Sequence, residues 1–318
     1  IQTQYKALRS AVGIAVYQDR TQVELTGKDR ATLLHGFCTN DIKRLQPGQG
    51  CEAFLTNAQG KTIGFMNIFC EENRLVIETA PGQAEFIIQS LERFLIREDV
   101  QLTDRSDSWR QLLVAGPTAA ALIEQVLGAD ITLEPLEHLQ CSWQGQELAV
   151  RRVDFTCQPD FLIATETDHW QACWDAFSAV AEVCDASAVE IARIEAGTPI
   201  FGVDISDENF PQEVDRDATA ISFTKGCYLG QETISRIDAM GRVNRVLRGI
   251  RMLSDEIPTR GDEFIREGKV VARVTSACWS YKLQAPVALA YVRREVSSLG
   301  SRLESSIGNA EVVALPFG

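Results

Sequence analysis

The sequence lacks the patterns that hold metals or disulfide frameworks. Its three histidines are scattered, and its nine cysteines include no C-x-x-C pair. Structural zinc sites and disulfide-rich folds need paired, closely spaced ligands, so neither class fits and no bound metal is expected. Most of the cysteines are expected to be small buried hydrophobes in a reducing compartment.

Long apolar runs and an excess of positive charge are also missing. No stretch of about 18 apolar residues is present, so no membrane span and no membrane partner are expected. The first residues lack the apolar segment of a signal peptide. A formal net charge of −13 argues against broad nucleic-acid binding. The expected location is the cytoplasm, or an organellar matrix or stroma if a transit peptide has been removed.

Motifs of several large enzyme classes are absent. The sequence contains no G-x-x-x-x-G-K-[ST] phosphate loop and no G-x-G-x-x-G dinucleotide fingerprint. It also has no G-x-S-x-G nucleophile elbow and no H-E-x-x-H zinc helix. Any chemistry must therefore come from other residues.

The patterns that are present indicate two or three domains, with α+β units followed by an all-β segment. Residues 51–69 predict a hairpin with its turn at "NAQGK", and residues 167–183 predict an amphipathic helix. Residues 187–197 predict a helix that starts at a capping box, Ser187 with Glu190, and stops at Gly197. From about residue 243 short strands separated by Gly and Pro predict a small β-barrel or sandwich.

The octapeptide "KGCYLGQE" (225–232) is the densest group of reactive residues. A helix is expected to start near Leu229, which places Cys227 just before a helix N-terminus with Lys225 two residues away. Both features favour a thiolate, so Cys227 is the best candidate for a reactive thiol. Gly226 and Gly230 permit a tight backbone turn. The alternative is a half-buried cysteine in a turn that serves only the fold.

Glu195 and a basic segment are two further candidates. Glu195 falls in the last turn of its predicted helix, where the helix dipole disfavours a carboxylate. It could accept hydrogen bonds from the ring N–H and amino group of a heterocycle, or it could be a surface acid paired with Arg193 or a neighbouring lysine. Five arginines between 236 and 251 could bind an anionic ligand or pair with acids just downstream.

The octapeptide is similar to the K-G-C-Y-x-G-Q-E signature of the YgfZ-type folate-binding proteins, which are paralogues of the glycine-cleavage T-protein (aminomethyltransferase). The likeness extends over most of the chain, through "LTGKDRATLLHGFCTNDI", "FLTNAQGK", "RIEAGTPIFGVDI" and "GKVVARVTSACWSYKLQAPVALAYV". The resemblance implies an α+β, three-domain cloverleaf of ferredoxin-like units with a central folate channel and a C-terminal β-barrel. We expect a discontinuous domain of residues 1–50 and 140–240 that carries the octapeptide, a second domain of residues 51–139, and a barrel of residues 241–318.

The resemblance also implies a function. It predicts a tetrahydrofolate-binding accessory protein for the assembly or repair of iron–sulfur enzymes, linked to tRNA thiolation. Its partners would be folate, as tetrahydrofolate or a one-carbon derivative, and iron–sulfur enzymes or cluster-assembly proteins. Cys227 and Lys225 are the expected catalytic pair, and Gly226, Gly230, Gln231 and Glu232 are expected to shape the motif loop. The expected folate ligands are Glu195, Asn57, Lys225, Tyr228 and Arg242.

One departure from the family separates the possible functions. The T-protein carries adjacent aspartates after its "TN…G" turn, whereas this chain has Gly64 and Phe65 there. This favours the accessory role over aminomethyl transfer. The alternative is an enzyme, a folate-dependent one-carbon transferase or demethylase of T-protein type. A cluster carrier with Cys227 as ligand is a third class, although a lone thiolate supplies one of the four ligands that a cluster normally takes.

Overall fold

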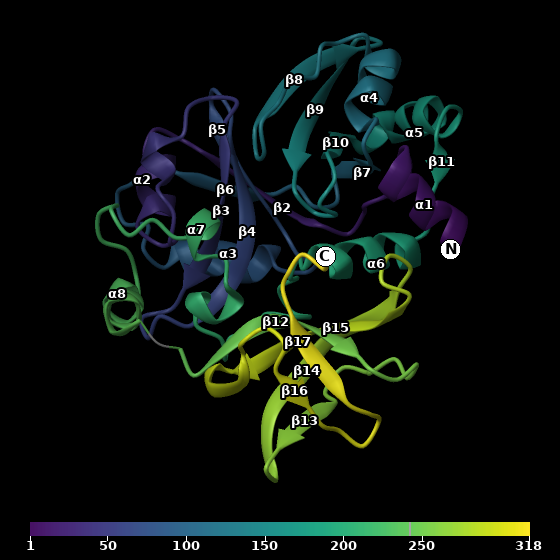
Figure 1. Ribbon diagram of the computed structural model, residues 1–318. Coiled ribbons are helices and arrows are strands. Elements are labelled where there is room, and N and C mark those ends of the chain that lie inside the picture. The colour runs from purple at the N-terminus through teal and green to yellow at the C-terminus, as the bar shows by residue number, and fades with distance from the viewer. Residues whose placement is uncertain (242) are drawn as a thin grey trace.

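The computed structural model describes residues 1–241 and 243–318, and its α+β chain forms three lobes (Figure 1). Sheet I has the strand order β11-β1-β7-β10-β9-β8, and sheet II has the order β3-β4-β5-β2-β6. The third lobe, the barrel, has the order β13-β14-β15-β12-β17-β16. A bridge between Ile265 and Glu304 joins its two edges, so the sheet nearly closes on itself. The expected α+β fold with a C-terminal β-barrel is confirmed.

Most neighbouring strands are antiparallel, and β1 with β11 is a parallel pair. The strands of sheet I are β1 (Gly13–Val16), β7 (Trp109–Ala115), β8 (His138–Trp143), β9 (Gln146–Val153), β10 (Asp160–Glu166) and β11 (Glu182–Val183). Those of sheet II are β2 (Thr21–Thr26), β3 (Gly50–Thr56), β4 (Thr62–Cys70), β5 (Arg74–Thr79) and β6 (Gln101–Asp104). Those of the barrel are β12 (Arg245–Met252), β13 (Glu263–Arg266), β14 (Lys269–Ser280), β15 (Ala285–Arg293), β16 (Arg302–Leu303) and β17 (Ala310–Val313).

Helices cover the sheets and connect the lobes. They are α1 (Gln2–Ser10), α2 (Arg30–His35), α3 (Ala84–Glu92), α4 (Ala119–Leu127), α5 (Trp170–Ser178), α6 (Ala186–Ala196), α7 (Asp217–Ala220) and α8 (Gln231–Met240). Short 3-10 turns are η1 (Ile42–Arg44), η2 (Thr167–His169), η3 (Pro211–Val214) and η4 (Arg294–Val296). In Figure 1, α6 lies between the lobe of sheet I and the barrel. Within the described residues, no helix has the length and apolarity needed to cross a bilayer.

The hairpin of β3 and β4 forms where the sequence predicts it. The side-chain Oδ1 of Asn57 accepts hydrogen bonds from the backbone N–H groups of Gln59 and Lys61, which closes the turn. Gly60 completes it with φ +76°, a left-handed value that favours glycine.

Helix α6 starts differently from the prediction. Its N-cap is Asp185, whose carboxylate accepts from the N–H of Ala188 at 3.0 Å. The capping box predicted at Ser187 is therefore wrong, because a better acceptor stands two residues earlier. Gly197 ends the helix with φ +75°, as predicted.

Two apolar clusters join the lobes to one another. One packs Phe54 of sheet II against Ile194 of α6 and Leu247 of the barrel. The other packs Phe69 of sheet II against Leu113 of sheet I. The lobes therefore share buried apolar surface around α6. This packing holds in place the walls of a cavity that lies between the lobes.

The strand pairing crosses the expected domain limits in two places. Strand β7, expected in the second domain, pairs with β1 and β10 of the first. Strand β2, expected in the first domain, pairs with β5, which was expected in the second. Sequence order suggested a break at residue 50, but β2 completes sheet II by pairing with β5 and β6. The limits of the three domains remain a prediction, and this pairing argues that the second one begins before β2.

Candidate functional site

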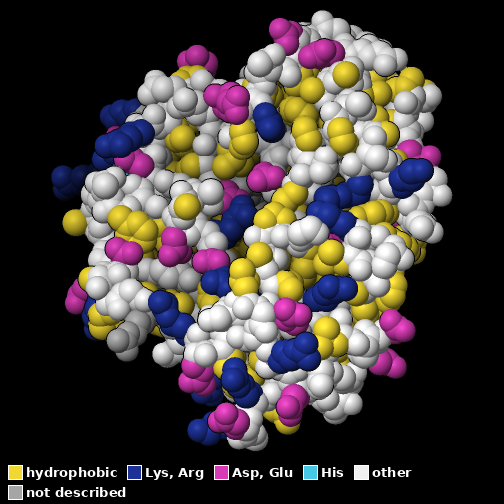
Figure 2. All heavy atoms as spheres, in the orientation of Figure 1, with side chains coloured by type: hydrophobic (Ala, Val, Ile, Leu, Met, Phe, Trp, Pro, Cys, Tyr) yellow, Lys and Arg dark blue, Asp and Glu magenta, His cyan; other side chains and the backbone are white. Residues whose placement is uncertain are grey.

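A cavity of about 120 Å³ lies where sheet II, sheet I and the loop after α6 meet. Sheet II contributes residues of β3, β4 and β5, the end of β9 contributes Val153, and the loop contributes Thr198 to Phe201. Figure 2 shows basic and acidic side chains gathered near the centre of the molecule, between the three lobes. Since a water takes about 30 Å³ of liquid volume, this cavity has room for roughly four waters.

One polar row crosses the sheet II side of the cavity. Asn67 on β4 lies directly opposite Glu52 on β3 and Glu78 on β5, and all three line the cavity. Side chains opposite one another on neighbouring antiparallel strands lie side by side on one face. The row therefore presents an amide between two carboxylates.

Each carboxylate of the row is already paired with an arginine. Arg20, in the connection between β1 and β2, places Nε 2.5 Å from Oε1 of Glu78, while the amide nitrogen of Asn67 donates to Oε2 at 3.2 Å. Arg216, just before α7, forms a two-pronged pair with Glu52. Burial disfavours a charged guanidinium, but the nearby Glu78 outweighs it and raises the pKa of Arg20, so Arg20 stays charged.

The other walls of the cavity are apolar and aromatic. Phe65 comes from β4, Phe155 follows β9, and Ile200 and Phe201 come from the loop after α6. Aromatic walls beside a row of hydrogen-bonding groups suit a flat ring that carries polar atoms on one edge.

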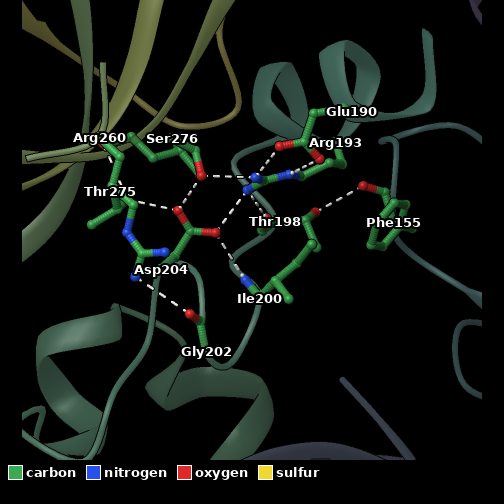
Figure 3. Close-up of polar contacts among 11 residues, drawn as sticks. Phe155, Glu190, Arg193, Thr198, Ile200, Gly202, Asp204, Arg260, Thr275 and Ser276 are labelled. Atoms are coloured by element: carbon green, nitrogen blue, oxygen red, sulfur yellow. Dashed lines mark hydrogen bonds and ion pairs between the residues drawn. The ribbon is translucent and has the colours of Figure 1, made fainter. Parts of the chain in front are cut away.

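A buried ion-pair network fixes the loop that forms one wall (Figure 3). Arg193 on α6 donates from Nη1 to Asp204 at 2.7 Å and from Nη2 to the hydroxyl of Ser276 at 2.7 Å. Asp204 also accepts from the backbone N–H of Ile200 at 3.0 Å and from the hydroxyl of Thr275 at 2.6 Å. Because Thr275 and Ser276 lie on β14, the network ties the barrel to the cavity wall.

Glu195 lies outside this cavity and is not a surface acid. Its side chain is 2% exposed, and its Oε2 accepts from the hydroxyl of Tyr5 at 2.6 Å. Its Oε1 accepts from the hydroxyl of Ser280 at 2.6 Å. Glu195 therefore joins α1 to the barrel, and its predicted role as a heterocycle ligand stays a prediction. The alternative pairing with Arg193 is wrong, because Arg193 binds Glu190 and Asp204 instead.

Lys225 acts as an internal brace in the structure. It is 7% exposed, and its ammonium donates to the backbone carbonyls of His35 and Cys38 at the end of α2. The ammonium also lies 4.7 Å from the ring centre of Tyr228, which is itself buried. Burial lowers the pKa of Lys225 and raises that of Tyr228. Neither residue lines the cavity, so their predicted contact with folate gains no geometric support.

Cys227 is exposed, whereas the other eight cysteines are buried or partly buried. The two glycines beside it differ. Gly230 has φ +83°, and a Cβ there would lie 2.4 Å from the carbonyl oxygen of Asn57. A Cβ on Gly226 would meet only Nε2 of His35, at 3.9 Å, and its backbone is not left-handed. The expected need for glycine therefore applies to Gly230 and not to Gly226.

The remaining predicted residues are spread over the same region. The side chain of Asn57 closes its own turn, away from the cavity. Helix α8 begins at Gln231, two residues later than expected, and Glu232 in its first turn is exposed. Arg242 lies outside the described residues. Of the nearby arginines, Arg245 pairs with Glu213 and Arg248 with Asp215, which are upstream acids and not the downstream ones that were expected.

The cavity residues were missed by the sequence prediction. A signal was present, because Asn67 and Glu78 interrupt two otherwise apolar strands, "TIGFMNIFC" and "RLVIET". The arginine partners of Glu78 and Glu52, Arg20 and Arg216, are distant in sequence and follow no spacing rule. Among the residues that the structure describes, no group of three or more His, Cys, Asp or Glu side chains forms a metal site.

Comparisons with known proteins agree along the whole chain. Residues 1–225 match the family described as the GCVT N-terminal domain, and residues 245–317 match the glycine cleavage T-protein C-terminal barrel domain. An aminomethyltransferase of Nostoc sp. is 29% identical over 100% of this chain and 87% of its own length. An aminomethyltransferase of Bacillus subtilis is 26% identical over 100% of this chain and 90% of its own length.

A solved structure has the same fold. The crystal structure of the glycine cleavage system aminomethyltransferase T from Bartonella henselae superposes with a TM-score of 0.90 at 19% identity. The match covers 99% of this chain and 89% of that one.

Proposed function

Since this chain belongs to the glycine cleavage T-protein family, we propose that it binds a reduced folate, tetrahydrofolate or a one-carbon derivative, in the cavity between its lobes. The observation that carries the proposal is the cavity itself, which combines aromatic walls with a row of hydrogen-bonding groups. A flat pterin ring has the matching shape and polar edge.

Folate-dependent one-carbon transfer is the activity that the comparisons favour. The relatives named aminomethyltransferase match this chain over its whole length. We therefore propose aminomethyl transfer, or a related N-demethylation, to tetrahydrofolate. The test is turnover of a panel of aminomethyl and N-methyl donors, followed by formation of a one-carbon folate. No product above background with any donor would contradict it.

An accessory role of the YgfZ type is the second candidate. Two observations favour it: Gly64 and Phe65 stand where the T-protein has adjacent aspartates, and the exposed Cys227 lies in the signature octapeptide. The predicted roles of Cys227 as a reactive thiol and of iron–sulfur enzymes as partners belong to this candidate. Complementation of a cluster-assembly defect by the wild type but not by Cys227→Ala would support it.

Folate binding itself is tested separately from either activity. Mass spectrometry of native protein should find a co-purified folate, and calorimetry should measure binding of 5-formyltetrahydrofolate. If the wild type binds no reduced folate, both candidates lose their basis.

A further inference from the structure

The basic segment near residue 245 continues into a groove on the barrel. The groove has a volume of about 920 Å³ and lies over strands β12 to β15, in the lower lobe of Figure 1. Of the residues that the structure describes, none lines both this groove and the cavity between the lobes. The charged residues of its lining are Arg245, Arg273, Arg293, Arg294, Glu263 and Glu295. The groove therefore carries an excess of positive charge in a chain whose formal net charge is −13.

Three of these arginines lie on one face of the barrel sheet. Arg245 on β12 lies directly opposite Arg293 on β15. Arg273 on β14 lies directly opposite Tyr291, which precedes Arg293 by two residues on β15. Residues that are opposite one another, or two apart on one strand, have their side chains on the same face. Arg245, Arg273 and Arg293 therefore surround the position of Tyr291.

The acids nearby do not neutralise all three arginines. Nε of Arg245 lies 3.1 Å from Glu213, and Arg273 pairs with Glu263 at the surface. Within residues 1–241 and 243–318, Arg293 has no carboxylate at ion-pair distance. Like charges directly opposite one another on neighbouring strands destabilise a sheet. A bound anion would offset the repulsion between Arg245 and Arg293.

The phenol of Tyr291 is the second sign of a ligand site. Tyr291 is 7% exposed and lines the groove, and its hydroxyl has no hydrogen-bond partner in the part of the chain that the structure describes. A buried tyrosine hydroxyl normally has a partner. The guanidinium carbon of Arg245 lies 5.1 Å from the centre of the ring. Burial raises the pKa of Tyr291, so the hydroxyl keeps its proton and can donate to an anion in the groove.

We propose that this groove binds a phosphate monoester, held by Arg245, Arg273 and Arg293, with the hydroxyl of Tyr291 as a further donor. Guanidinium groups bind phosphate oxygens through paired N–H donors. A phosphate monoester has three terminal oxygens and a charge of about −1.5 to −2 at pH 7. It therefore suits three guanidinium groups better than a carboxylate does. This site goes beyond the proposed folate binding and does not depend on it.

Calorimetry at fixed ionic strength tests the site with phenyl phosphate as the probe. The proteins are the wild type, Arg293→Gln, Tyr291→Phe and a matched control, Arg251→Gln. Arg251 is an exposed arginine on β12 that does not line the groove. The comparison probes are dimethyl phosphate, glutarate and an oligonucleotide without a terminal phosphate. A separate titration with 5-formyltetrahydrofolate measures folate binding by the same four proteins.

Arg293→Gln should weaken the binding of phenyl phosphate by about 10- to 100-fold, because a charge-assisted hydrogen bond is lost. Tyr291→Phe should weaken it by about 3- to 10-fold, the effect of one neutral donor, and Arg251→Gln by less than about twofold. Without phosphate, Tyr291→Phe should unfold at or above the wild-type temperature, because the hydroxyl that it removes has no partner in the described residues. All four proteins should bind 5-formyltetrahydrofolate equally.

Several results would overturn the site. One is a wild type that does not bind phenyl phosphate, and another is equal binding by the wild type, Arg293→Gln and Tyr291→Phe. Equal affinity for dimethyl phosphate or the oligonucleotide overturns the monoester in favour of a phosphodiester, and tighter binding of glutarate overturns it in favour of a carboxylate. Loss of folate binding in Arg293→Gln would make the groove part of the folate site and overturn its independence. Failure of all four proteins to bind the folate contradicts the proposed function alone.

Discussion

Replacing Gly230 by alanine tests how the signature loop is attached to sheet II. Gly230 precedes α8 with φ +83°, and it packs against the β3–β4 turn. An added Cβ would lie 2.4 Å from the carbonyl oxygen of Asn57 and 2.9 Å from the Cα of Gly60. Both neighbours are backbone atoms of a closed turn, so neither has a flexible end that could move aside.

The expected loss of stability has two parts. The left-handed conformation costs a residue other than glycine roughly 1–2 kcal/mol. Forcing an extra carbon against backbone adds roughly 1–3 kcal/mol of overpacking. Gly230→Ala should therefore lower the free energy of unfolding by about 2–5 kcal/mol.

Two other glycines distinguish the cost of the left-handed conformation from the cost of overpacking. Gly128 ends α4 with φ +71° and has open space around the position of a Cβ, so Gly128→Ala should show the conformational cost alone. Gly226 has neither a left-handed φ nor a close neighbour, so Gly226→Ala should be neutral or slightly stabilising. Urea unfolding followed by circular dichroism gives all three values. Equal losses in Gly230→Ala and Gly128→Ala would refute the close packing of the loop against the turn.

Three more outcomes are expected. Lys225→Met should lower the free energy of unfolding by about 2–4 kcal/mol, because two buried carbonyls lose a charged donor; urea midpoints equal to wild type would contradict this. Burial and Arg151 lower the pKa of His138 from 6.5 to about 4 in the folded protein. Between pH 6.5 and pH 4 the unfolded chain therefore binds more protons at this site than the folded chain does, so acid favours unfolding. The wild type should therefore lose up to ~3 kcal/mol relative to His138→Gln as the pH falls through that window, and parallel stability curves would rule this out. Native protein should show one fast thiol toward an aromatic disulfide reagent, absent in Cys227→Ala, while the melting temperature is unchanged; several equally fast thiols would argue against it.

Much of the fold could be predicted because its signals are local. The β3–β4 turn follows from Asn57 and Gly60 within five residues, and the end of α6 follows from Gly197. The start of α6 was misplaced because Asp185 competes with Ser187 for the same role at short range. The partner of β2 was harder to predict, since β5 is about 50 residues away and the pairing depends on which strands share a sheet.

The cavity could not be predicted in the same way. Lys225 and Cys227 stand close together in a distinctive motif, yet one is a buried brace and the other is exposed. The groups that line the cavity come from separate strands, and their register is a tertiary property. Glu52 and Glu78 meet Asn67 only because β4 lies between β3 and β5 in sheet II.

The charges around the cavity bear on which ligand it accepts. Gly64 and Phe65 stand where the resemblance to the T-protein led us to expect carboxylates, but Asn67, two residues further along β4, also lines the cavity and is flanked by two acids. Each acid is paired with an arginine, so the row as a whole is close to neutral. A neutral row with free acceptors suits an uncharged ring with N–H donors and gives little attraction to a free ammonium group. Asp154 is the exposed carboxylate of the lining for which the described residues provide no arginine partner. A cationic amine would therefore be drawn to Asp154 at the exposed side of the cavity.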